Sequence, residues 1–136
     1  MARPVFLAAA DRGAGSLSLI EGLVRELQIL SPLKGSDVFV PHMQIGDVGI
    51  ETDAAAHFSR SLEAIAASRV VVAVLDGPQV DDGVAFLVGC AFAARKPVIG
   101  YATDGRAKTH FVELALTELA HDPRSLSVAL ARALAE

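Results

Sequence analysis

The residues best suited to chemistry in this chain are three aspartates and two glycines that fall within one short segment. They are Asp76, Gly77, Asp81, Asp82 and Gly83. Carboxylates grouped in this way can hold the hydroxyls of a sugar, because each carboxylate oxygen accepts hydrogen bonds. Simpler structural roles also exist: Asp82 would cap the helix that follows, and Asp76-Gly77-Pro78 would form a turn. Capping explains one acid of the three, so we expect a ligand site here as well.

The apolar run before Asp76 determines where these carboxylates would lie. Val70 to Leu75 is apolar at every position, which predicts a strand buried on both faces in the middle of a parallel sheet. Ligands of open α/β sheets bind just beyond the carboxyl ends of the strands. We therefore expect the three aspartates to cluster at that edge of the sheet.

Strand-like and helix-like patterns alternate along the rest of the chain. The predicted strands are Pro4 to Ala9, Asp37 to Val40, Val70 to Leu75, Pro97 to Tyr101 and, at an edge, Leu116 to Ala120. The predicted helices run through Leu17 to Leu27, Phe58 to Ala66, Asp82 to Ala94 and Ser125 to Leu134. The residues of the second helix expected to face inward are Phe58, Leu62, Ile65 and Ala66. This order predicts one α/β domain over residues 1–136, a Rossmann-like, doubly wound parallel sheet of four or five strands with helices on both faces.

The composition excludes several classes of function. The net charge of -4 and the lack of a basic cluster argue against a nucleic-acid partner. No apolar run approaches the ~18 residues that span a membrane, so we expect no membrane partner. The single cysteine, Cys90, indicates a reducing, cytoplasmic setting. A small chain with a mean hydropathy of +0.44 is expected to bury some surface against a copy of itself, as a homo-oligomer.

Other motifs in the chain carry little chemistry. Gly13-Ala14-Gly15 lacks the third glycine of a dinucleotide loop, because Ser18 stands at that position. Ser59 and Ser61 have no nucleophile-elbow context. The histidines lack the spacing of metal ligands and are interpreted as surface or loop residues; they are His42, His57, His110 and His121. We therefore expect no metal and no cofactor.

The segment VVVAVLDGPQVDDGVAFLVGCAFAARKPVIGYATDGR resembles the nucleoside 2-deoxyribosyltransferase family. The opening PVFLAA and the strand VFVP resemble that family's first two strands, and the likeness reaches to about Arg106. The resemblance implies a small, commonly oligomeric α/β enzyme that cleaves the N-glycosidic bond of deoxynucleosides. A glutamate of the family attacks the sugar carbon, and the sugar then passes to another base or to water. Asp76 and Asp81 match the family's aspartates after the central strand and before the helix.

One position departs from the family pattern. The glutamate nucleophile stands four residues after the helix-opening glycine, and the same count from Gly83 reaches Leu87, which cannot act as nucleophile, acid or base. Ser61 and Arg69 also stand where acidic residues are frequent in the family. The chain contains no asparagine, which some members contribute across the subunit interface. The resemblance implies substrate contacts at Leu7, Ala8, Asp76, Gly77, Asp81, Asp82, Gly83 and Leu87.

Three hypotheses follow from the residues and the resemblance. In the first, which we favour, the protein keeps a pocket for a nucleoside or nucleotide but lacks catalysis. In the second, the protein is an active N-glycosidic bond transferase or hydrolase, with Asp81 or Asp82 supplying the carboxylate and Asp76 as a further catalytic candidate. Either carboxylate would lie on the loop rather than one turn inside the helix, and a ~1 Å shift can cost ~100-fold in rate. In the third, the chain is a purely structural oligomer subunit, which leaves the acidic turn unexplained.

Overall fold

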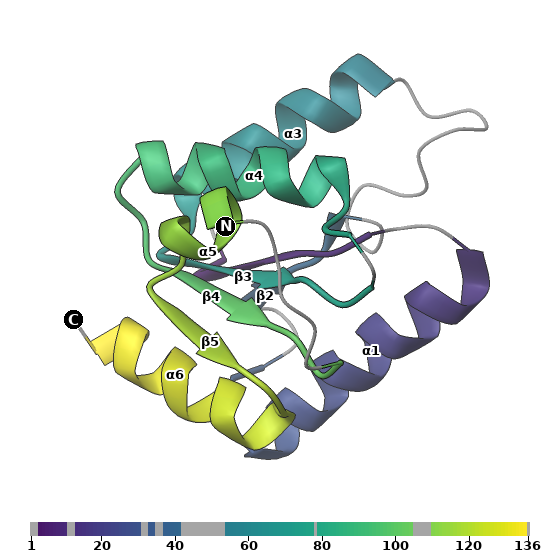
Figure 1. Ribbon diagram of the computed structural model, residues 1–136, viewed down its shortest axis with the longest axis vertical. Helices are drawn as coiled ribbons and strands as arrows, with labels where there is room; N and C mark the ends of the chain where they lie inside the picture. The colour runs from purple at the N-terminus through teal and green to yellow at the C-terminus, as the bar shows by residue number, and fades with distance from the viewer. Residues whose placement is uncertain are drawn as a thin grey trace.

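The apolar runs of the sequence form the strands of a single parallel sheet (Figure 1). The computed structural model describes residues 3–10, 13–30, 33–34, 37–41, 54–77, 79–104 and 110–135. Its strands are β1 (Val5–Ala8), β2 (Val38–Phe39), β3 (Val70–Val74), β4 (Val98–Tyr101) and β5 (Glu118–Ala120). They are hydrogen-bonded in the order β2-β1-β3-β4-β5. This order places β3 in the middle of the sheet, as its unbroken apolar run predicts.

All strand pairs are parallel, and the register aligns Leu7 of β1 with Val72 of β3 and Val72 with Ile99 of β4. Because alternate residues of a strand point to opposite faces, β1 sends Val5 and Leu7 into one core cluster and Phe6 and Ala8 into another. Each face of the sheet therefore needs its own cover of helices.

The helices lie on both faces of the sheet, which confirms the predicted α/β class. They are α1 (Gly13–Leu30), α3 (Ala54–Ala67), α4 (Asp82–Ala93), α5 (His110–Ala115) and α6 (Pro123–Ala135). Helices α1 and α6 pack on one face, and α3, α4 and α5 pack on the other (Figure 1). None of the helices within the described ranges is long and apolar enough to cross a membrane.

Some expectations about the inward faces of the helices are wrong. Phe58 is 52% exposed instead of buried, and its ring stacks on Phe86 of α4. Ala66 is also exposed, whereas Ile65 and the polar Ser61 are buried. The sequence pattern does not predict helix α5. Strand β5 is an edge strand as expected, but it covers only the last three residues of the predicted run.

Candidate functional site

Asp76 forms hydrogen bonds that connect the loop after β3 with the loop after β4. Its carboxylate accepts hydrogen bonds from the backbone N–H of Thr103 at 2.6 Å, from the Thr103 hydroxyl at 2.8 Å and from the backbone N–H of Asp104 at 3.2 Å. The Asp104 carboxylate in turn accepts from the backbone N–H of Gly77 at 2.8 Å. Gly77 has a φ of +114°, a conformation that side chains other than glycine rarely adopt. The two loops thus form a mutually bonded corner at the carboxyl edge of the sheet.

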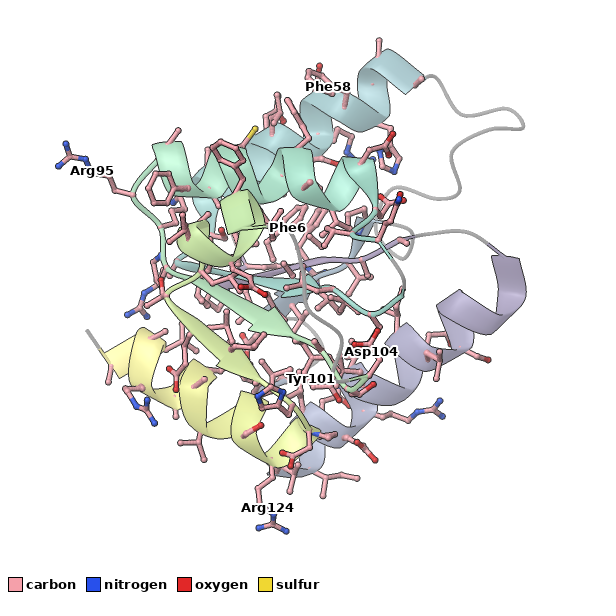
Figure 2. All side chains as sticks on the ribbon, viewed as in Figure 1. Phe6, Phe58, Arg95, Tyr101, Asp104 and Arg124 are labelled. Carbon is pink, nitrogen blue, oxygen red and sulfur yellow. The ribbon has the colours of Figure 1, made fainter. Side chains whose placement is uncertain are left out.

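A pocket of about 440 Å³ opens beside Asp76. Helix α1 forms one wall, with Ser18, Leu19, Ile20, Gly22, Leu23 and Glu26. The ends of β1, β3 and β4 and the residues after them form the rest, with Ala9, Ala10, Val74, Asp76, Tyr101 and Thr103. Figure 2 shows Tyr101 and Asp104 at this end of the sheet near α1. The volume is typical of a small-molecule site.

The position of the pocket follows from the strand order. After β1 the chain passes to β2 at the edge, and it then returns to β3 on the other side of β1. The crossover that leaves β1 and the crossover that leaves β3 therefore run in opposite directions, the first through α1 on one face of the sheet and the second through α4 on the other. Such a switch point leaves a crevice beyond the strand ends, where open α/β sheets bind their ligands.

Tyr101 is a buried residue with a hydroxyl group that lines this pocket. It is 7% exposed, and its pKa is raised above the usual value of 10.0 by burial and then by the negative charges of Asp76, Glu26 and Asp122. Its hydroxyl therefore stays protonated at neutral pH and can donate a hydrogen bond. Two carboxylates that line the same pocket, from Asp76 and Glu26, can accept one.

Asp81 has a different role, as the residue that caps α4. Its backbone is extended, and its carboxylate accepts a hydrogen bond from the backbone N–H of Val84 at 3.2 Å. The prediction that Asp82 caps this helix is therefore wrong, because Asp82 is already the first helical residue. A side chain on Gly83 would place its Cβ 3.1 Å from the Asp81 carboxylate, which favours glycine there.

The structure separates the expected site residues into groups. Asp76 lines the pocket on the α1 side, whereas Asp81 and Asp82 begin α4, which packs on the opposite face of the sheet. Leu87 is partly buried and packs against the core cluster beneath α4. Leu7 and Ala8 are only 1% and 0% exposed. The next two residues of the chain, after β1, line the pocket in their place.

Sequence reasoning missed Glu26. The signal for it is weak but present, since Ser18, Gly22 and Glu26 recur every fourth residue and so share one stripe of α1 beside its apolar face. Polar and small residues in such a stripe indicate a side of the helix that does not pack against the hydrophobic core and can line a pocket.

The histidines differ from their predicted setting at one position. His57 is half-buried on α3 rather than in a loop, and its Nε2 atom is buried without a hydrogen-bond partner among the described residues. His121 is exposed after β5, as expected. His42 lies outside the described residues, as does the Pro78 of the predicted turn, and only the position of His110 at the start of α5 is described. Across the described ranges, no three His, Cys, Asp or Glu side chains are grouped to hold a metal ion.

Comparisons with known proteins agree with this fold. Residues 5–120 match the model of the nucleoside 2-deoxyribosyltransferase family. A conserved protein from Enterococcus faecalis V583 superposes with a TM-score of 0.81 at 20% identity, over 97% of this chain and 99% of that one. The 2-deoxyribosyltransferase of Bacillus psychrosaccharolyticus gives 0.76 at 20% identity, over 90% and 89%.

The CMP N-glycosidase of Clostridium botulinum superposes with a TM-score of 0.56 at 17% identity, over 93% of this chain and 97% of that one. No curated protein matches the chain. At these identities the solved structures establish the shared fold, and the match over residues 5–120 establishes the family. The chain therefore belongs to the nucleoside 2-deoxyribosyltransferase family.

Proposed function

We propose that this protein binds a nucleoside or nucleotide in the pocket beside Asp76 and does not cleave its glycosidic bond. The observation that carries the proposal is the pocket of about 440 Å³ at the switch point of the sheet. It is large enough for a ligand of that size, and it lies where this class of sheet binds ligands. Membership of the family supports a nucleoside as the type of ligand.

The pocket offers matching chemistry on its different walls. The carboxylates of Asp76 and Glu26 can accept hydrogen bonds from sugar hydroxyls, and the protonated Tyr101 hydroxyl can donate one. Leu19 and Leu23 of α1 provide apolar surface for a base. An amphipathic ligand with a polar sugar and a flat, less polar base fits this division.

The absence of catalysis is inferred from Leu87 and Asp81. By resemblance Leu87 stands at the position of the family's nucleophilic glutamate, and its side chain packs against the hydrophobic core. Asp81, the alternative carboxylate, accepts a hydrogen bond from the first turn of α4. Use of Asp81 as a nucleophile would compete with this cap. Asp81 also precedes the position of the family's glutamate by more than a full helical turn, whereas a displacement of ~1 Å already costs ~100-fold in rate.

A variant that fills the pocket tests the proposed site. A Cβ added at Gly22 meets no atom within 4 Å, so the side chain of Gly22→Leu begins in open space at the pocket wall. Replacing a helical glycine also raises stability by roughly 0.5–1 kcal/mol. We expect at least one member of a panel of deoxynucleosides, ribonucleosides and their monophosphates to raise the melting temperature of the native protein. At 100 times its Kd a ligand adds about 2.7 kcal/mol.

The same ligand should leave the melting temperature of Gly22→Leu unchanged. Ala131→Leu, at an exposed position of α6 away from the pocket, serves as the matched control and should respond as the native protein does. If no member of the panel shifts the native protein, or if Gly22→Leu responds equally, the assignment of the site is wrong.

We also propose a cytoplasmic setting and a homo-oligomeric state. The single cysteine and the apolar composition support these two inferences.

A further inference from the structure

Glu26 presents a carboxylate to the pocket beside Asp76, from the wall that α1 forms. The residues three and four positions away from Glu26, which are its neighbours on the helix surface, are all uncharged; they are Gly22, Leu23, Ile29 and Leu30. Among the described residues, no hydrogen bond or ion pair reaches the Glu26 carboxylate. A ligand in the pocket can therefore pair with it.

The electrostatic potential of the pocket is negative. Asp76 and Glu26 both line it, and none of its described lining residues is a lysine, an arginine or a histidine. The pKa of Tyr101 is raised first by burial, and the remaining causes are all negative charges. Asp76 already accepts three hydrogen bonds from the loop after β4, which leaves Glu26 as the carboxylate with more capacity for a ligand.

A positive charge in a neighbouring groove is engaged elsewhere. Arg124, in the first turn of α6, lines a groove that shares Glu26 with the pocket and also contains Asp122. The Arg124 side chain points away from Tyr101 (Figure 2). The pKa of Asp122 is lowered first by hydrogen bonds with Ser125 and then by the charge of Arg124. Arg124 therefore interacts with Asp122 and leaves the pocket negative.

We propose that the ligand of this pocket is a nucleoside whose base carries a positive charge, and that Glu26 is the residue that selects it. This inference rests on the proposed function and names the class of nucleoside that the site prefers. Leu19, Leu23 and Glu26 are spaced four and three residues apart, so they share one face of α1. A base that packs on the two leucines lies next to the Glu26 carboxylate, which then pairs with a positive charge on that base.

The same charges disfavour a phosphate in the pocket. Near a protein surface, opposite charges about 4 Å apart attract strongly enough to raise affinity by about ten-fold or more, and like charges lower it by a similar factor. A nucleoside monophosphate carries about two negative charges at neutral pH and would lie close to Asp76 and Glu26. We therefore expect a nucleoside to bind more tightly than its own monophosphate.

Two pairs of methylated deoxynucleosides separate charge from shape. The bases of 1-methyldeoxyadenosine and 3-methyldeoxycytidine are cations at neutral pH, whereas N6-methyldeoxyadenosine and 5-methyldeoxycytidine carry the same methyl group on a neutral base. Isothermal titration calorimetry at low salt gives the Kd of each compound. For at least one pair we expect the cation to bind about ten-fold more tightly than the neutral compound, and the monophosphate of the neutral compound to bind about ten-fold more weakly.

Glu26→Gln should reduce the preference for the cation to about two-fold or less, because the amide is neutral. Glu21→Gln is the matched control: Glu21 is exposed on the same helix and is not among the described lining residues, so its variant should keep the preference. Glu26 is exposed as well, so both variants should fold as the native protein does.

Three results would overturn this inference while leaving the proposed function in place. They are equal affinity of the native protein for the cation and the neutral compound in both pairs, a preference that survives in Glu26→Gln, and a monophosphate that binds as tightly as its nucleoside. If the native protein binds none of the nucleosides, the inference and the proposed function are both wrong.

Discussion

At the scale of single residues, Asp76 has a structural role that can be separated from ligand binding. Its three hydrogen bonds hold the loop after β4. Asp76→Ala should lower the free energy of unfolding by about 1 kcal/mol, since Asp76 is exposed and water replaces part of what is lost. Asp76→Asn keeps one acceptor oxygen and should lose less. Urea denaturation measures the free energy of unfolding of both variants. If the two variants lose equal amounts, the charge of the Asp76 carboxylate maintains the loop, rather than the hydrogen bonds that it accepts from Thr103.

Leu87 allows a gain of function to be tested. We expect Leu87→Glu to release base from deoxynucleosides slowly, whereas the native protein releases none. The gain should be small, because Ser61 and Arg69 remain unlike the family's acidic residues, and the new carboxylate should cost about 1–3 kcal/mol of stability in this partly buried position. Chromatography of the free base provides the measurement.

Leu87→Gln is the matched control, because the glutamine side chain has the length and shape of glutamate but carries a neutral amide instead of a carboxylate. This variant should be inactive. If the native protein releases base rapidly and Asp81→Asn abolishes this, the carboxylate before α4 performs the chemistry and Leu87 is irrelevant to it.

At the scale of the elements, Asp81 and Asp82 have different expected costs. Asp81→Ala removes the acceptor for the Val84 N–H and should cost about 1 kcal/mol of unfolding free energy, while Asp81→Asn should cost only a few tenths. Asp82→Ala should cost less than Asp81→Ala, because its contribution at the first helical position is mainly electrostatic. Equilibrium urea denaturation compares the three variants. A larger loss from Asp82→Ala would contradict the assignment of the cap.

The sequence predicts the strands better than it predicts what the helices expose. The run from Val70 to Leu75 has no polar side that could face solvent, so the sequence predicts its central position in the sheet. The position of Phe58 against Phe86 could not be predicted, because it depends on how α3 packs beside α4, which the periodicity of one helix does not specify. Likewise, Asp81 and Asp82 have the same side chain, and only the backbone conformation determines which of the two caps α4. The pocket wall at Glu26 depends on the angle at which α1 crosses the sheet, which periodicity does not specify.

At the scale of the whole molecule, the single tyrosine reports on the pocket. Because Tyr101 has a raised pKa when folded, the unfolded chain gives up this proton near pH 10 while the folded protein still holds it. Below pH 10 the ionisation of Tyr101 does not change the free energy of unfolding. As the pH rises above 10 toward the higher pKa of the folded state, the free energy of unfolding falls. Tyr101→Phe should remove this part of the decline. Since the chain has no other tyrosine, tyrosinate absorbance follows the titration directly. A midpoint at or below 10 would contradict the buried, negatively charged setting.

The central claim is that the protein binds a nucleoside or nucleotide without cleaving it, and one-dimensional proton NMR of the ligand tests both parts in one sample. With the native protein and each member of the panel, saturation transfer from protein to ligand should appear for at least one member. The anomeric proton signal of that ligand should then stay undiminished through prolonged incubation. Loss of the anomeric signal with the appearance of free base would contradict the claim by showing catalysis, and the absence of saturation transfer across the whole panel would contradict it by showing no binding.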